Sequence, residues 1–291
     1  MSVNENPTVN LGEIARTLKI DRLPVVGKGL RKAGRAINQW WYGDEGVPAH
    51  VDNDVNLRLS SKVFSGGSFL FDPRLTAELR RLAQPGKGFL DAGAHIGVAS
   101  LIYANAAGKD ARIVAFEPNP NAYPLLTENN HVNGLPIECF RMALGNEVGM
   151  TTFYVDGKDP NASLSSDAPG KYWYWDGREK PRLTECAVPI TTIDKICDAI
   201  GFQPGLIKLD VEGAELRVLE GAMETLRNCR PEILMETHVF AWPSFGYGRE
   251  DLVKLLDDLE YETLDGYGNP FDGLLGDGPE KDNNHFLLKP K

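Results

Sequence analysis

Short apolar runs alternate with longer amphipathic stretches along the chain from about residue 88 onward. Such alternation predicts strands joined by helices through right-handed βαβ crossovers. The predicted strands are Gly88–Ala92, Arg112–Phe116, Ile137–Ala143, Leu206–Asp210, Glu232–His238, Tyr261–Leu264 and His285–Leu288. The predicted helices are Gly97–Ala106, Asn121–Asn133, Thr192–Ile200, Ala214–Arg227 and Glu250–Leu259. The pattern therefore predicts an α/β fold that is doubly wound around a mostly parallel, seven-stranded sheet.

Residues 145–190 do not follow this alternation. The segments TTFYV (151–155) and ECAVPI (185–190) have the composition of two additional strands, and they enclose a polar, aromatic loop from Asp156 to Thr184. Long insertions on α/β folds commonly carry specificity. We therefore predict that this insertion contributes to ligand recognition.

Four aromatic residues are candidates for contact with that ligand. Aromatic faces flanked by polar groups suit the apolar faces of sugar rings, and they equally suit a hydrophobic natural product. The candidates are Tyr172, Trp173 and Trp175 in the insertion and Trp242, which would form the opposite wall of the same cavity. The alternative is a loop whose aromatic side chains pack onto the domain.

The amino-terminal segment, residues 1–85, differs from the main domain that we predict over 86–291. Apolar residues recur near helical spacing at Leu30, Ala33, Ile37, Trp40 and Trp41. Basic residues lie between them, and the stretch from Arg16 to Arg35 contains a single acid, Asp21. We therefore predict an α-helical appendage with a cationic face, packed on the main domain. The alternatives are a lid over substrate, or a contact for an anionic partner, a membrane surface or a second copy.

Composition limits the class of protein. The chain of 291 residues is 42% hydrophobic and 25% charged, which is ordinary for a globular protein and too apolar for disorder. Its net charge of -10 argues against a nucleic-acid partner, because phosphate binding needs a concentrated basic surface. The start, MSVNENPTVN, lacks the pattern of a secretory signal, and no window has the apolar length of a membrane span. We therefore expect a cytoplasmic location.

The most informative stretch is FLDAGAHIGVAS, residues 89–100. A strand that ends at Asp91 is followed by Gly93, Gly97 and a helix, which brings backbone N–H groups to the carboxyl edge of the sheet, where ligands bind in this architecture. A dinucleotide fingerprint would need glycine where this chain has His95. The carboxylate of Asp91 also suits an ammonium group better than a pyrophosphate. The loop therefore favours a ligand that contains an amino acid.

The second predicted strand ends in Glu117. An acidic side chain at this position accepts hydrogen bonds from the two hydroxyls of an unphosphorylated ribose. An adenosine that carries a cationic amino acid would satisfy both Asp91 and Glu117. This description matches S-adenosylmethionine, and it disfavours a nicotinamide cofactor.

The chain resembles an FkbM-type, S-adenosylmethionine-dependent methyltransferase of the class I, Rossmann-like fold. The resemblance extends from about Phe89 to His238. It rests on the ordered motifs LDAGAHIG (90–97), VAFEPNPNAYPLLTENNHVN (114–133), ALG (143–145), NASLSS (161–166), VPITTID (188–194), LIKLDVEGAELRVLEGA (206–222) and ILMETH (233–238). It implies methylation of hydroxyl groups on sugars, glycolipids or polyketide-like natural products. One departure is His95, where the family often has Asn.

The resemblance also implies a cofactor site by position. Glu117 would hold the ribose, and Asp210 would lie beside the sulfonium. The methionine part would be lined by Asp91, Gly93 and Gly97, with His95 and Asn119 nearby. The chain around Met142 and Ala143 would border the adenine.

An alcohol acceptor needs a base to remove its proton. Candidates at the predicted strand ends are Asp210, Glu212, Glu215, Glu236 and His238. We choose His238 as general base because its ordinary pKa lies near working pH, and we interpret Glu215 as structural. The set Asp210, Glu236 and His238 could hold a divalent ion, although a metal-free acid/base pair is preferred.

The sequence therefore predicts an O-methyltransferase that uses S-adenosylmethionine on a hydroxyl of a sugar-containing or other small natural-product acceptor. One alternative is N- or carboxyl-methylation on the same fold. The other is a non-catalytic Rossmann-like scaffold whose basic amino-terminal helix recruits a partner.

Overall fold

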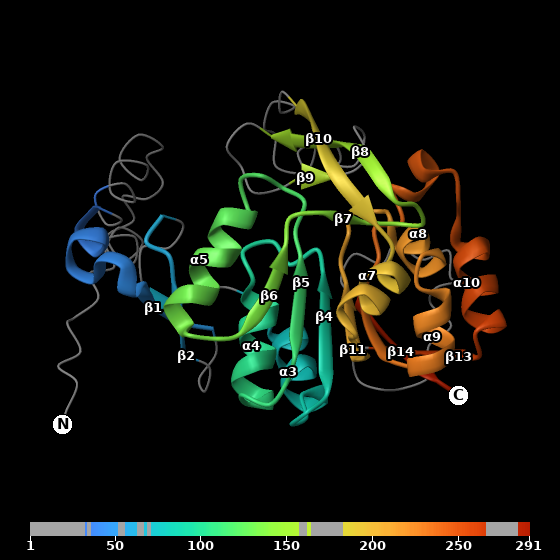
Figure 1. The fold of residues 1–291 in the computed structure, drawn as a ribbon, viewed down its shortest axis with the longest axis horizontal. Helices are drawn as coiled ribbons and strands as arrows, with labels where there is room; N and C mark the ends of the chain where they lie inside the picture. Colours follow the sequence, from blue (N-terminus) through green and yellow to red (C-terminus); the bar gives the residue numbers. More distant parts are fainter. Residues whose placement is uncertain are drawn as a thin grey trace.

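The main feature of the structure, a computed structural model, is a seven-stranded sheet (Figure 1). The structure describes residues 33, 36–51, 56–62, 67–68, 71–156, 162–163, 183–265 and 285–291. The strands of this sheet are β4 (Gly88–Ala92), β5 (Ile113–Phe116), β6 (Ile137–Phe140), β11 (Pro204–Leu209), β12 (Glu232–Glu236), β13 (Tyr261–Leu264) and β14 (His285–Pro290). Their order is β13-β14-β12-β11-β4-β5-β6.

The direction of the strands agrees with the sequence-based prediction. The five strands β6, β5, β4, β11 and β12 are parallel, and β14 runs antiparallel to both β12 and β13. The predicted mostly parallel, seven-stranded α/β sheet is therefore confirmed. The chain extends from β4 to β6 and then returns to β11 on the other side of β4, so the strand order reverses between β4 and β11. Ligands of open α/β sheets bind outside the carboxyl ends of the strands at such a switch point.

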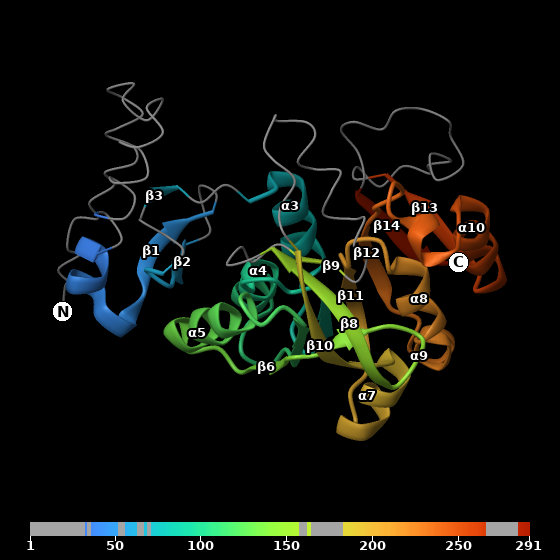
Figure 2. The same ribbon diagram turned by 90° about the horizontal axis from the view of Figure 1, so that it is seen from above.

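Helices cover both faces of the sheet (Figures 1 and 2). One face packs against α3 (Pro73–Leu82), α4 (Val98–Ala107) and α5 (Tyr123–Asn133). The other packs against α7 (Ile193–Ile200), α8 (Glu215–Glu220), α9 (Met223–Cys229) and α10 (Arg249–Asp258). Because successive strand residues point to opposite faces, the neighbours Phe89 and Leu90 belong to two different hydrophobic clusters.

Three predicted elements differ from the structure. The predicted helix 214–227 is two helices, α8 and α9, separated at Gly221, where a Cβ would lie only 2.0 Å from the carbonyl oxygen of Gly145. The predicted strand 137–143 ends at Phe140, because Ala143 belongs to a different sheet. The predicted strand 232–238 ends at Glu236, so His238 lies beyond the strand.

The insertion forms a second sheet over the carboxyl edge of the first (Figure 1). Its strands are β7 (Ala143–Leu144), β8 (Gly149–Asp156), β9 (Ala162–Ser163) and β10 (Leu183–Thr191), in the order β7-β10-β8-β9. The antiparallel pair of β8 and β10 contains both TTFYV and ECAVPI, so the two predicted additional strands are present. Tyr172, Trp173 and Trp175 lie outside the described residues.

The described part of the amino-terminal appendage contains strands as well as helix. Residues 36–42 are helical and lead through η1 (Gly43–Glu45) into a three-stranded sheet. Its strands are β1 (Val47–His50), β2 (Asn56–Leu59) and β3 (Gly67–Ser68), in the order β2-β1-β3. The sequence analysis expected only helices here, because it did not recognise these short strands. The basic stretch 16–35, apart from residue 33, lies outside the described residues.

This small sheet is fastened to α5. The backbone N–H of Ser60 donates to Oδ1 of Asn129 over 2.7 Å, and Nδ2 of Asn129 donates to the carbonyl oxygen of Ile96 over 2.8 Å. Leu57 and Leu59 of β2 are buried in the same hydrophobic cluster as α3, α4 and α5. The described part of the appendage therefore shares its core with the main sheet.

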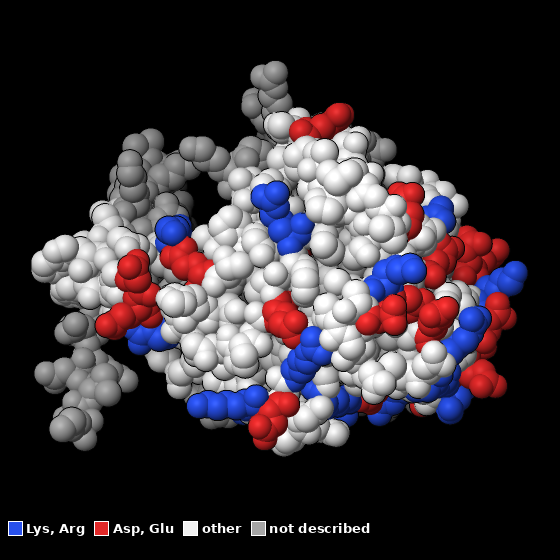
Figure 3. Space-filling view, in the orientation of Figure 1, with Lys and Arg blue, Asp and Glu red and all other residues white. Residues whose placement is uncertain are grey.

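The surface carries mixed charge. On the face seen in Figure 3, the described Lys and Arg side chains lie among Asp and Glu side chains rather than in one basic patch. Of the helices that the structure describes, none combines the length and apolar character needed to cross a membrane.

Candidate functional site

A cavity of about 530 Å³ lies at the carboxyl ends of β4, β5, β11 and β12, which is the switch point of the sheet. Its volume falls within the range of small-molecule and cofactor sites. Its walls come from the glycine loop after β4, from the ends of β5 and β11, from the insertion and from the segment that begins α3. The cavity therefore collects residues from both domains that the sequence analysis distinguished.

The glycine loop forms the floor. Gly93 has φ of +81°, and a Cβ there would lie 1.8 Å from the carbonyl oxygen of Asp210, so only glycine allows this close approach of β4 and β11. His95 also has positive φ, and both Gly93 and His95 line the cavity. Gly97 does not line it. A Cβ on Gly97 would lie 2.6 Å from Cδ1 of Leu126, so Gly97 serves the packing of α4 against α5.

Glu117 stands at the end of β5, facing the cavity. Its two carboxylate oxygens accept the backbone N–H groups of His95, over 2.7 Å, and Asn119, over 2.8 Å. Burial raises the pKa of the Glu117 carboxyl to about 7, although both N–H groups favour the ionised form. Asn119 is buried and acts through Glu117 rather than at the cavity wall. The loop thus aims a buried carboxylate at the cavity.

The wall beside Glu117 is apolar. Met142, Ala143 and Leu144 line it from the chain after β6, and Phe153 lines it from β8. Phe116, next to Glu117, also contacts the cavity. A carboxylate beside apolar surface can bind a ligand that has both hydroxyl groups and a flat, apolar ring.

Asp91 does not line the cavity, which corrects the expectation that it would contact a cofactor directly. The side chain is completely buried, and its register partner on β11, Lys208, lines the cavity instead. Oδ2 of Asp91 accepts the hydroxyl of Ser100 over 2.6 Å, while Oδ1 is 3.4 Å from Nζ of Lys208. Asp91 therefore acts by neutralising a buried lysine.

Lys208 is a site residue that the sequence analysis missed. Its ammonium group donates to the carbonyl oxygen of Gly93 over 3.2 Å and to Oδ2 of Asp210 over 3.0 Å. Although burial disfavours the charge, Asp210 and Asp91 raise the pKa of Lys208 above its ordinary value. In return, Lys208 and His238 hold the pKa of Asp210 below its usual range, against the effect of burial. Lys208 lies in β11, two residues before Asp210, which directly follows the strand, and that spacing was a signal for its position.

Carboxylates gather at the far end of the cavity. Asp210, Glu212 and Glu236 all line it, as does His285 from β14. Nε2 of His285 is 3.1 Å from Oε2 of Glu236, its register partner on β12. Although burial opposes the charge, Glu236 raises the pKa of His285. Asp72, which caps α3, is 3.8 Å from Nδ1 of the same imidazole and brings the appendage into the cavity wall.

Glu212 has the most exposed side chain of the three carboxylates at this end, at 38%. It adopts a positive φ of 53°, which turns the chain sharply between β11 and α8. Partial burial of the carboxyl raises the pKa of Glu212 to about 7. The nearby carboxylates of Asp210 and Glu236 raise this pKa further, and His238 opposes the shift.

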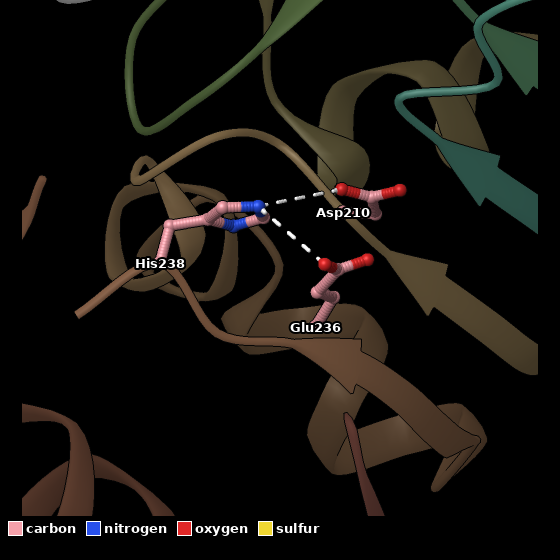
Figure 4. A group of neighbouring side chains, drawn as sticks. All are labelled: Asp210, Glu236 and His238. Carbon is pink, nitrogen blue, oxygen red and sulfur yellow. Dashed lines mark ion pairs between the residues drawn. The ribbon is translucent and has the colours of Figure 1, made fainter. Parts of the chain in front are cut away.

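His238 lies behind these carboxylates, is buried and does not line the cavity. Its Nε2 points toward Asp210 and Glu236, at 3.9 and 3.8 Å (Figure 4). Although burial disfavours the charged ring, a hydrogen bond to Glu215 and the nearby carboxylates raise the pKa of His238 to about 10. A base must be unprotonated at working pH, which this raised pKa opposes, so the role of His238 as general base stays a prediction.

Glu215 fixes that imidazole. Its Oε1 lies 2.7 Å from Nδ1 of His238 and accepts the backbone N–H of Gly213, while Oε2 accepts the indole N–H of Trp242 over 2.8 Å and the hydroxyl of Tyr247 over 3.2 Å. Because a carboxylate only accepts, Nδ1 carries a hydrogen and Nε2 faces the carboxylate cluster. The structural interpretation of Glu215 is thus extended: it positions His238.

Trp242 does not line the cavity either. The ring is 1% exposed, stacks on Tyr247 and donates to Glu215. The expectation that it forms a wall for an acceptor is therefore corrected, because its face and its N–H are both engaged in the core.

Residues 91–263 match the family described as methyltransferase FkbM domain. The chain is 28% identical over 176 residues to the hexuronic acid methyltransferase AglP of Haloferax volcanii, covering 60% of this chain and 62% of that protein. It is 28% identical over 194 residues to the methyltransferase sdnD of Sordaria araneosa, covering 60% of this chain and 73% of that protein.

Among solved structures, methyltransferase FkbM of Methylobacillus flagellatus aligns with 70% of this chain and 43% of its own, at 17% identity and a TM-score of 0.42. The family match spans more than half of the chain and includes the glycine loop, Glu117 and the carboxylate cluster. The chain therefore belongs to the methyltransferase FkbM domain family.

Proposed function

We propose that the protein transfers the methyl group of S-adenosylmethionine to a hydroxyl group of a sugar-containing or other small natural-product acceptor. The observation that carries the proposal is Glu117, a buried carboxylate at the end of β5 that two backbone N–H groups aim into a cavity at the switch point of the sheet. Membership of the methyltransferase FkbM domain family supports the same activity.

The residues on this side of the cavity fit the cofactor. Glu117 would accept hydrogen bonds from the ribose hydroxyls, and the apolar surface of Met142, Ala143 and Leu144 would hold the adenine. The close approach at Gly93 keeps the floor free of side-chain atoms. Lys208 and Asp210 offer one charge of each sign to the amino-acid part.

Bound S-adenosylmethionine supplies a methyl group attached to a sulfonium sulfur, which keeps the electron pair when that bond breaks. The protein has to hold the acceptor oxygen in line and to accept its proton. We assign proton acceptance to Glu212, because its side chain lines the cavity and is partly exposed there. Asp210 contacts Lys208, Glu236 contacts His285 and Glu212 contacts His238, so the assignment to Glu212 rests on its exposure and not on its contacts.

The charge of the cavity favours a hydroxyl acceptor. Asp210, Glu212 and Glu236 would repel a free carboxylate, which disfavours carboxyl methylation by the protein alone. The name of the relative AglP, a hexuronic acid methyltransferase, supports a sugar-containing acceptor for this chain as well. Because a hexuronic acid carries a carboxylate, the same name keeps carboxyl methylation as the alternative to be tested. Three expectations about partners stay predictions. They are that the protein binds no nucleic acid, that membrane contact is possible but not favoured, and that the protein can form an oligomer.

The test is methyl transfer from S-adenosylmethionine with a ¹³C-labelled methyl group. The acceptor panel contains matched sugars that offer only hydroxyl groups, an added amine or an added carboxylate, and NMR identifies the methylated atom. We expect oxygen methylation of a hydroxyl. Glu212→Gln should reduce turnover by about 10²-fold or more while S-adenosylhomocysteine still binds. A methyl group found on nitrogen or on a carboxylate would establish one of the alternatives, and no transfer to any acceptor would favour the scaffold.

A further inference from the structure

The carboxylate cluster contains a geometry that an ion-pair network does not explain. An ionised N–H···O⁻ contact is normally about 2.7–2.9 Å long. The carboxylates of Glu212, Glu236 and Asp210 instead stop 3.5, 3.8 and 3.9 Å from Nε2 of His238, which is almost completely buried. Three carboxylates thus surround one ring nitrogen at distances longer than a charged hydrogen bond.

The spacing suits one ion. Asp210, Glu236 and His238 each offer a ligand atom, and these atoms lie within 4.8 Å of one another (Figure 4). Two ligands at about 2.1 Å from a common ion are at most about 4.2 Å apart. The distances from Nε2 of His238 to Oδ1 of Asp210, 3.9 Å, and to Oε1 of Glu236, 3.8 Å, meet that limit, and the ligand atoms of the two carboxylates lie within 4.8 Å of each other.

Each of the three side chains is also held from behind. Lys208 binds Oδ2 of Asp210, leaving Oδ1 toward Nε2 of His238. Nε2 of His285 contacts Oε2 of Glu236, and Oε1 of Glu236 is 3.8 Å from Nε2 of His238. Glu215 contacts Nδ1 of His238. Histidine ligands of metals almost always donate their second N–H to such a carboxylate or carbonyl, which orients the ring.

We infer that Asp210, Glu236 and His238 form a binding site for a divalent cation, with Glu215, Lys208 and His285 as the residues that orient them. Two carboxylates and one imidazole suit Mn²⁺, and Mg²⁺ is the closest alternative. Asp210 and Glu236 line the cavity, so the cation would face an acceptor with two neighbouring oxygens, such as a vicinal diol. It would lower the pKa of the hydroxyl that it binds. This role in acceptor binding rests on the proposed function, whereas the cation site does not.

The test is a titration of the full chain, freed of metal with a chelator, with Mn²⁺, followed by the electron paramagnetic resonance signal of free Mn²⁺. We expect one saturable site. His238→Gln and Glu236→Gln should weaken it at least about tenfold, and Glu215→Gln about 10- to 100-fold. His131→Gln, a matched change of an exposed histidine on α5, should leave it unchanged.

Binding of S-adenosylhomocysteine, measured on the same preparations, shows that each variant is folded and separates this inference from the proposed function. Glu117→Ala should lose the nucleoside and keep Mn²⁺, while His238→Gln should lose Mn²⁺ and keep the nucleoside. The inference is overturned if wild-type protein that binds S-adenosylhomocysteine shows no saturable site for Mn²⁺ or Mg²⁺. It is equally overturned if His238→Gln and Glu236→Gln both bind Mn²⁺ as tightly as wild type.

Discussion

Replacement of Glu117 by Gln tests the cofactor half of the site. The change keeps the size of the side chain but removes one acceptor oxygen and the charge. A hydrogen bond to an ionised acceptor contributes about 1.5–3 kcal/mol, so losing one from a ribose hydroxyl weakens binding roughly 10- to 150-fold. We expect a loss of this size in calorimetric titration with S-adenosylhomocysteine at pH 8.

The pH dependence sharpens this test. With a pKa of about 7, the Glu117 carboxyl is roughly one-tenth ionised at pH 6 and nine-tenths ionised at pH 8. If only the ionised form accepts the ribose hydroxyls, wild-type affinity rises about tenfold between these pH values, and Glu117→Gln removes that rise. Glu224→Gln, an exposed change on α9, is the matched control. Equal wild-type affinity at pH 6 and pH 8, or unchanged affinity of Glu117→Gln, would refute the assigned role.

The same pKa shift predicts a change in folding stability. The pKa of the Glu117 carboxyl is raised from 4.5 to about 7 in the folded protein, so the folded protein holds this proton more tightly than the unfolded chain. The stability that the proton provides is fully present below pH 4.5 and is lost as pH rises through about 7. The shift corresponds to about 3 kcal/mol of unfolding free energy. In urea unfolding, wild type should lose stability relative to Glu117→Gln between pH 5 and pH 8, and parallel pH profiles would contradict this.

Three further substitutions separate structural roles from roles in binding. Asn129→Ala leaves the backbone N–H of Ser60 and the carbonyl oxygen of Ile96 without their amide partner and should lower the unfolding free energy by about 2–4 kcal/mol in urea. An unchanged urea midpoint would show that Asn129 does not hold the small sheet to α5. Gly93→Ala places a Cβ against the carbonyl oxygen of Asp210 and should abolish S-adenosylhomocysteine binding in calorimetry, whereas retained affinity would show that the floor can move. Trp242→Phe removes one donor to Glu215 and should cost about 1–3 kcal/mol of stability without changing the KM for acceptor, which a wall residue would change.

The sequence predicted the sheet well because each strand is a short apolar run bounded by a helix of clear periodicity. It also predicted the carboxyl edge as the site, since Gly93, Glu117 and Asp210 each follow such a run. Period-two spacing could have placed Lys208 beside Asp210, but the sequence analysis did not recognise this lysine as a partner for buried acids.

Other features depend on contacts between distant parts of the chain. His285 reaches Glu236 only because β14 runs antiparallel to β12, and local periodicity does not show strand direction. The aromatic residues after His238 led us to predict a cavity wall at Trp242, but the indole N–H of Trp242 donates to the buried carboxylate of Glu215 and its ring lies in the core. Sequence spacing therefore identified the candidate residues but not which of them face the cavity.

The most direct test of the central claim is a crystal structure of the protein with S-adenosylhomocysteine. The account predicts the ribose hydroxyls within hydrogen-bonding distance of Glu117, the adenine against Met142 and Ala143, and the sulfur on the side of Asp210. A nucleoside bound elsewhere, or an empty cavity in protein shown by calorimetry to bind the nucleoside, would contradict it.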